Sequence, residues 1–186
     1  MQTLIRLYKM ISSIIEKKFA CRNDAGKRAY LRKRGCLIGE TTRFSGSLPF
    51  IGEPYLVEIG EDCLISGNVH FYTHDGGVKV LNSLGMFNDK KMDKMARIKV
   101  GNNCFLGNSS SIMMGVSIGD NCIIGANSVV TKSTPPNSVV AGMPARVICT
   151  IEDYYKKNLD RGVFYSTPGM SIQERRNYLQ KKVPKI

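Results

Sequence analysis

An aliphatic residue recurs at every sixth position across residues 100–130, and this period is the strongest constraint on the fold. The series is Val100, Leu106, Ile112, Ile118, Ile124 and Val130. The position after each aliphatic residue is glycine in four of the six sextets, and the fifth position always carries a small residue. A fixed period is informative because every repeat must form the same structural unit.

A period of six fits neither an amphipathic strand nor a helix, whose periods are 2 and 3.6. It predicts a β-helix in which each sextet forms one flat face and three faces close one coil. The aliphatic residue then points inward, and glycine, Asn or Asp supplies the turn. Stacked coils bury a continuous aliphatic column. An ordinary β-rich domain with accidental spacing is the alternative.

The same phase reaches back toward the N-terminus and is broken once. Earlier sextets begin at Ile38, Phe44, Ile59, Ile65 and Phe71. The 29 residues from Phe71 to Val100 are not a multiple of six, so residues 75–97 are predicted to leave the coil as an excursion loop. Loops of this length in compact domains are usually functional.

These patterns predict three regions: a basic amphipathic helical segment (1–34), the β-helix (35–148) and a basic helical tail (149–186). In the first, residues 3–20 carry an apolar face typical of a membrane-surface helix or of a helix packed on the coil or on a neighbouring subunit. That face is formed by Leu4, Leu7, Tyr8, Ile11, Ile14 and Ile15. In the tail, residues 151–160 and 171–181 are predicted helices, the second capped by Ser171 and Glu174.

The net charge of +12 is concentrated at the ends, with +8 in residues 1–34, zero in 35–149 and +4 in 150–186. Basic ends attract anionic partners, such as an anionic membrane surface, or keep an oligomer soluble. No nucleic-acid partner is expected, because the basic runs lack interleaved aromatic residues. No membrane span or signal peptide is expected either, so the sequence favours a cytoplasmic protein, with peripheral membrane contact as an option.

The six cysteines include no CxxC pair. Three of them, Cys63, Cys104 and Cys122, occupy the small fifth position of a sextet. They are therefore predicted to be small core residues rather than disulfide partners or zinc ligands.

Residues 98–148 resemble the hexapeptide-repeat acyltransferases, the family of the galactoside and maltose O-acetyltransferases and the serine acetyltransferases. The matching run is IKVGNNCFLGNSSSIMMGVSIGDNCIIGANSVVTKSTPPNSVVAGMPARVI, with its VVTK and PAR elements. The THDGG and IEDYYKK segments are similar to the branch that acetylates surface polysaccharides. The resemblance implies an all-β fold, a left-handed parallel β-helix with short N- and C-terminal helices and one protruding loop. It also implies a homotrimer, with active sites in the clefts between neighbouring coils, and acetyl-CoA as donor.

Transfer of an acetyl group to a hydroxyl needs a base, and histidine suits this because its ordinary pKa is near neutrality. The family carries its catalytic histidine where the coil leaves for the loop, which is His74 here. His70 is the other candidate base and is assigned to substrate binding. Asp75 is predicted to orient His74 or to contact the acceptor, and a plain turn residue is the alternative.

Six further positions match family residues at the coenzyme. Asn108, Gly125, Ala126 and Thr131 correspond to contacts with the pantetheine arm, and Lys132 and Arg146 to contacts with the phosphates. Ordinary turn residues and solvated charges are the alternatives. Met143 departs from the family, which often has Asn before this proline.

The sequence therefore predicts an acetyl-CoA-dependent O-acetyltransferase that acts on a sugar or glycan precursor by direct transfer, with no essential cysteine. An antibiotic or amino-acid acceptor, or a non-catalytic β-helix scaffold, is the alternative. A β-helix carbonic anhydrase needs three histidine zinc ligands and this chain has two histidines, so no metal is expected unless a neighbouring subunit completes the site.

Overall fold

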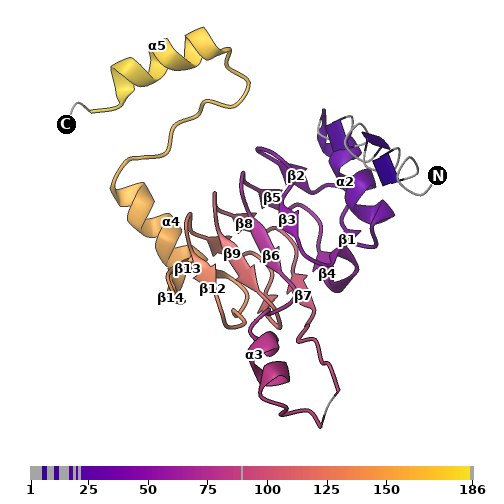
Figure 1. Cartoon of the computed structure of the whole chain (residues 1–186). Helices are drawn as coiled ribbons and strands as arrows, with labels where there is room; N and C mark the ends of the chain where they lie inside the picture. The colour runs from indigo at the N-terminus through magenta and orange to yellow at the C-terminus, as the bar shows by residue number, and fades with distance from the viewer. Residues whose placement is uncertain are drawn as a thin grey trace. The chain divides into compact units, whose positions relative to one another are not determined.

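The chain winds into a three-sided parallel β-helix in the computed structural model, which describes residues 6–7, 11–12, 17–18, 20, 22–88 and 90–184 (Figure 1). Each coil contributes one short strand to each of three sheets. The predicted fold class, a left-handed parallel β-helix with short helices near its ends and one protruding loop, is confirmed.

The three sheets are named A, B and C in the order in which the chain visits them. Sheet A holds β1 (Leu37–Ile38), β4 (Val57–Ile59), β7 (Ile98–Val100) and β10 (Ser117–Ile118). Sheet B holds β2 (Arg43–Phe44), β5 (Leu64–Ile65), β8 (Phe105–Leu106), β11 (Ile123–Ile124), β13 (Ser138–Gly142) and β14 (Ala145–Thr150). Sheet C holds β3 (Phe50–Ile51), β6 (His70–Tyr72), β9 (Ser111–Met113) and β12 (Val129–Val130).

The aliphatic residues of the six-residue period form the core. In sheet B, for example, Ile65 pairs with Leu106 and Leu106 with Ile124, and all three side chains are fully buried. Burying an aliphatic side chain contributes about 1.5–3 kcal/mol relative to exposure. The repeat is thus a column of stacked apolar side chains with one layer per coil, and the prediction of inward aliphatic residues is confirmed.

Residues with left-handed backbone make the corners between sheets A and B. Asp62, Asn103, Asn121 and Asn137 have φ between 52° and 58°. Asn and Asp tolerate this conformation better than other side chains do. The Asn103 side-chain amide donates to Asn121 Oδ1 (2.9 Å), and the Asn121 amide donates to Asn137 Oδ1 (2.8 Å), so the corners are also tied along the prism.

The excursion leaves sheet C at Thr73 and returns at β7. Its two ends pair with each other, because Asp75 N donates to Lys94 O (2.9 Å) and Ala96 N donates to Thr73 O (3.0 Å). Between them lie α3 (Val78–Ser83) and a return segment that is fixed to it through Asn82 and Met92. The loop therefore has an ordered base at the corner where it departs.

The two ends of the prism are covered differently. At the first coil, η1 (Pro54–Leu56) lies between β3 and β4, and α2 (Asp24–Lys33) packs over the coil with Lys27 Nζ donating to Gly46 O (2.7 Å). At the last coil, β14 folds back antiparallel on β13. Residues 22–34 were predicted only as part of a basic helical segment, and α2 turns out to use its cations as donors to coil carbonyls.

The predicted apolar face of residues 3–20 lies partly outside the described residues, which exclude Leu4, Tyr8, Ile14 and Ile15. Leu7 and Ile11 are helical and about half exposed. Within the part of the chain that the structure describes, no helix combines the length and apolar character that crossing a membrane requires.

The C-terminal residues 152–186 form a separate unit. It contains most of α4 (Ile151–Asp160) and α5 (Ile172–Lys182). The predicted capping box is confirmed, because Ser171 Oγ accepts from Glu174 N while the Glu174 carboxylate accepts from Ser171 N.

Candidate active site

His74 lies at the corner between sheets C and A, at the base of the excursion. Its backbone pairs with Met95 of the returning segment, and its side chain is 48% exposed. The position is therefore held by the coil on one side and by the loop on the other, while the imidazole stays open to solvent.

The imidazole contacts a carboxylate from the preceding coil. His74 Nδ1 lies 2.9 Å from Glu53 Oε2, and the Glu53 side chain is 19% exposed. An ionised carboxylate only accepts hydrogen bonds, so Nδ1 must carry the proton in this contact. The tautomer that results leaves Nε2 with a free lone pair, which is the form a general base requires.

Thr73 fixes this carboxylate. The Thr73 hydroxyl donates to Glu53 Oε2 and accepts from the Glu53 backbone N–H (2.8 Å). Hydrogen bonds from Thr73 and then from His74 lower the pKa of the Glu53 carboxyl below its ordinary value of 4.5. Glu53 is thus ionised at neutral pH, as the tautomer argument requires.

Asp75, which was predicted to orient His74 or contact the acceptor, has other partners in this structure. Its Oδ2 lies 2.7 Å from Lys94 Nζ, and its Oδ1 accepts from Gly77 N (2.8 Å). The contact with Lys94 joins the two ends of the excursion. The carboxylate that contacts the imidazole is Glu53.

His70 lies in β6 on the outward face of sheet C. Its ring is 5.6 Å from that of Phe50, in an edge-on arrangement, and 5.7 Å from that of Tyr72. Phe50 is 50% exposed. The residue predicted for substrate binding therefore belongs to an aromatic cluster of three rings that leads toward the His74 corner.

The residues predicted at the coenzyme fall on two corners of the prism. Asn108, Gly125 and Ala126 lie where sheet B turns into sheet C, on two adjacent coils linked by the hydrogen bond from Asn127 N to Asn108 O (2.9 Å). Thr131 and Lys132 follow β12, at the same C-to-A corner as His74, and are exposed. Sheet C separates the two groups within one chain.

Arg146 lies in β14 and is exposed, with its Nη1 donating to Ala145 O (2.9 Å). Lys132 and Arg146 both belong to the last coil and its closing hairpin. Both cations are therefore available to an anionic ligand at this end of the prism.

The three cysteines of the repeat are buried and free, as predicted. The Cys104 thiol lies between those of Cys122 and Cys63, and its hydrogen bonds to them, together with burial, raise its pKa. All three side chains are at most 2% exposed, so a substrate cannot reach their sulfur atoms. Among the described residues, no group of three His, Cys, Asp or Glu side chains has the arrangement of a metal site.

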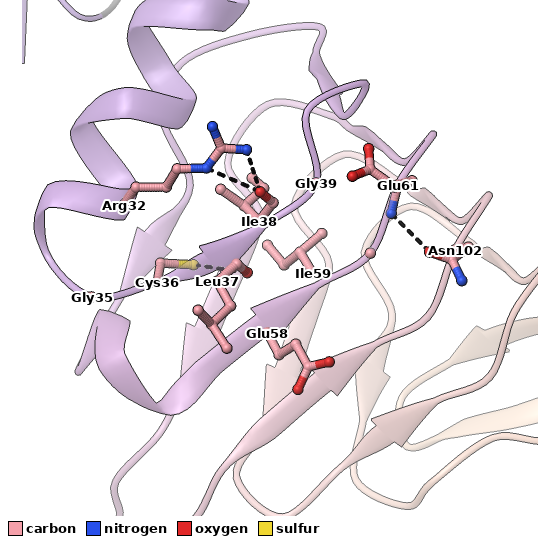
Figure 2. A pocket seen from close by; sticks show the side chains of 11 residues that line it. Arg32, Gly35, Cys36, Leu37, Ile38, Gly39, Glu58, Ile59, Glu61 and Asn102 are labelled. Atoms are coloured by element: carbon pink, nitrogen blue, oxygen red, sulfur yellow. Dashed lines mark hydrogen bonds between the residues drawn. The ribbon is translucent and has the colours of Figure 1, made fainter.

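A pocket of about 540 Å³ lies apart from these residues, on the first coils beside α2 (Figure 2). Its polar groups already have protein partners: Arg32 donates to Ile38 O (3.1 Å from Nε), and Asn102 Oδ1 accepts from Glu61 N (2.9 Å). Because its cation and amide are engaged in linking α2 and neighbouring coils, we assign this pocket no role in the chemistry.

Sequence reasoning missed Glu53 and Thr73, although a signal was present. The first two coils are offset by 21 residues in sheets A and B, as in the pairs Ile38–Ile59 and Phe44–Ile65. Glu53 precedes His74 by the same 21 residues. Sheet C is offset by 20 residues instead, as in the pair Phe50–His70, so the coil offset narrows the neighbour of His74 to Glu53 or Pro54.

Comparison with known sequences places the repeat in a described family. Residues 97–132 match the family described as "Hexapeptide repeat of succinyl-transferase". The chain is 40% identical over 154 residues to Protein CapG of Staphylococcus aureus, which covers 82% of this chain and 86% of that protein. It is 42% identical over 114 residues to galactoside O-acetyltransferase of Escherichia coli, covering 58% of this chain and 53% of that enzyme.

Solved structures share the fold. A maltose O-acetyltransferase from Clostridium difficile superposes with a TM-score of 0.54 at 24% identity, over 73% of this chain and 82% of that one. The hexapeptide-repeat acetyltransferase VCA0836 from Vibrio cholerae, solved as a complex with acetyl coenzyme A, superposes with a TM-score of 0.50 at 21% identity, over 73% and 82%.

Proposed function

The chain belongs to the hexapeptide-repeat acyltransferase family, and from this premise we propose that it transfers an acetyl group from acetyl-CoA to a hydroxyl of a sugar or glycan precursor. The observation that carries the proposal is the exposed His74 imidazole with its Nδ1 on the Glu53 carboxylate. A related galactoside O-acetyltransferase and a structural neighbour bound to acetyl coenzyme A support the reaction class.

The proposed reaction is a direct transfer with His74 as general base. His74 Nε2 takes the proton of the acceptor hydroxyl as its oxygen attacks the thioester carbonyl carbon. The tetrahedral intermediate collapses, the carbon–sulfur bond breaks, and the departing thiolate takes the proton back from Nε2. Glu53 stays ionised throughout and stabilises the imidazolium that forms between the two steps. No protein nucleophile takes part, so the buried thiols have no chemical role.

The donor is proposed to contact residues from two corners of the prism. Exposed Asn108 and Ala126, with half-buried Gly125, present small side chains and backbone to a pantetheine arm. Thr131 and Lys132 lie at the corner that carries His74. Lys132 and Arg146 supply positive charge for the coenzyme's phosphates.

A homotrimer is proposed because the two groups of coenzyme residues lie at opposite edges of sheet C. One extended ligand cannot run along both corners of the same chain without crossing this face. Two copies, each offering a different corner to a shared cleft, would bring the two groups together. A chain that sediments as a monomer while retaining full turnover would contradict this arrangement.

A sugar acceptor is favoured over an antibiotic or an amino acid by the aromatic cluster of Phe50, His70 and Tyr72 beside the His74 corner. Aromatic faces offer a flat apolar surface to the C–H groups of a pyranose ring. Antibiotics and amino acids are tested as acceptors in the same assay.

Release of free thiol from acetyl-CoA, measured with a panel of sugar, nucleotide-sugar, amino-acid and antibiotic acceptors, tests the proposal. Sugar-dependent release is expected from the wild type, and His74→Ala should lower kcat by about 100-fold or more. His70→Ala is the comparison variant and should act on KM for the acceptor rather than on kcat. Wild-type protein that binds no acetyl-CoA in calorimetry, or His74→Ala with near-normal turnover, would overturn it.

A further inference from the structure

The contact between His74 and Glu53 depends on two residues that do not touch the imidazole nitrogen that reacts. The first is Thr73, whose side chain is fully buried one residue before His74. Its hydroxyl accepts from the backbone N–H of Glu53 and donates to the carboxylate of the same residue. One hydroxyl thus ties the Glu53 side chain to the Glu53 main chain, which leaves the carboxylate little rotational freedom.

The second residue is Gly52, which precedes Glu53. A Cβ added at Gly52 would lie 2.6 Å from Thr73 Oγ1 and 3.2 Å from His74 Nδ1. Gly52 is not among the glycines with positive φ, so its backbone would accept another residue. The glycine is therefore required for space: without it, the hydroxyl and the imidazole cannot both stay where they are.

We propose that Thr73 and Gly52 are positioning residues that hold the Glu53 carboxylate on Nδ1 and so keep His74 in the tautomer with Nε2 free. The inference rests on the proposed function, because it explains how that base is kept competent. The two coils contribute two adjacent residues each, Gly52 with Glu53 and Thr73 with His74, and the parallel stacking of β3 on β6 brings them together.

The histidine tautomer is a direct readout of this role and needs no acceptor. The chain has two histidines, so ¹⁵N-labelled imidazole signals are few and His70 serves as an internal control. In the wild type, His74 should show one protonated Nδ1 and one unprotonated Nε2 at neutral pH. Thr73→Val keeps the shape and removes the hydroxyl, and should give a mixture of tautomers at His74 with His70 unchanged. Thr73→Ser should restore the wild-type signals.

Kinetics give the second readout. Thr73→Val should lower kcat by about 10-fold with little change in KM for acetyl-CoA, since misplacing a reacting group costs rate more than binding. Thr73→Ser should recover most of that loss. A purely structural role for Thr73 would instead lower the melting temperature of both variants and leave the kcat of the folded fraction unchanged.

A matched glycine pair keeps the proposal testable if Thr73→Val does not fold. Gly52→Ala should disturb the His74 tautomer and lower kcat in the same way. Gly76→Ala, two residues after His74, is the control, because nothing lies within 4 Å of a Cβ added there. Equal behaviour of these two variants in both measurements would overturn the proposal, as would an unchanged His74 tautomer in folded Thr73→Val.

The tautomer measurement separates this inference from the proposed function. If the wild type transfers no acetyl group to any acceptor, the proposed function fails. The effect of Thr73 and Gly52 on the His74 tautomer would still be decided by the spectra.

Discussion

The later coils of the prism follow the six-residue period without interruption, whereas the earlier coils depart from it, and the candidate base lies where they depart. After β9, the C-to-A corner is a short turn through Gly115, with φ of 78°. After β6, the same corner opens into the excursion and carries His74. A strict repeat fills every inward position with apolar side chains and leaves tight corners. Side chains that can do chemistry are placed where the period is broken.

Shortening a buried side chain in the regular half of the prism should lower stability without changing turnover. Leu106→Ala empties a fully buried position in β8 and should lower the free energy of unfolding by about 2–5 kcal/mol. Leu84→Ala in the excursion, where the side chain is 64% exposed, should stay within about 0.5 kcal/mol. Chemical denaturation at fixed protein concentration measures both. Equal losses in the two variants would break the distinction between the two regions.

Substitutions at the corner that carries His74 should lower turnover instead. Glu53→Gln replaces a pure acceptor by a side chain that can donate to Nδ1, which favours the wrong tautomer of His74. We expect kcat to fall by about 10-fold or more, with KM for acetyl-CoA nearly unchanged. Glu58→Gln on the outward face of sheet A, where the side chain pairs with Lys99, is the control and should keep wild-type kcat. A normal kcat for Glu53→Gln would show that the Glu53 carboxylate has no role in catalysis.

The lowered pKa of the Glu53 carboxyl predicts how the stability of the fold changes at acidic pH. A carboxyl whose folded-state pKa lies below its ordinary 4.5 stabilises the fold above that value, and the contribution is lost as pH falls through the folded-state pKa. The stability difference between wild type and Glu53→Gln should therefore shrink below pH 4.5. Thermal unfolding at a series of pH values measures it. His74 and the Asp75–Lys94 pair lie near this corner as well.

The smallest effect is expected inside the regular half, at its thiols. Cys122→Ala removes a buried thiol whose Sγ donates to Pro135 O (3.2 Å), so a modest loss of stability is expected. The kcat of the folded protein should not change, because direct transfer uses no thiol. A large loss of kcat with normal stability would indicate a covalent intermediate and would contradict the mechanism proposed for His74.

Much of the fold could be predicted from local sequence. The period from Val100 to Val130 fixes the inward positions, since each layer of the column is filled by a buried apolar side chain. Gly107 illustrates the corner rule: a Cβ there would lie 2.5 Å from the backbone N of Ala126 on the next coil. The capping box at Ser171 is equally local, because its two hydrogen bonds span three residues.

Only part of the candidate site could be predicted from the sequence. The family that the repeat resembles carries its catalytic histidine where the coil leaves for the loop, and so His74 could be predicted as a candidate base. Its partners could not be read from neighbouring residues, and Asp75 was the natural choice because it is adjacent in the chain. The carboxylate that contacts Nδ1 lies 21 residues earlier.

The sequence by itself determined the three-sided prism, because a six-residue aliphatic period admits one way of burying its side chains. The tertiary structure alone decided which acidic residue meets the imidazole. Parallel stacking brings Gly52 and Glu53 beside Thr73 and His74, while the paired ends of the excursion draw Asp75 to Lys94. Residues one coil apart are neighbours in space, and the number of residues in an irregular coil becomes certain only once the chain is folded.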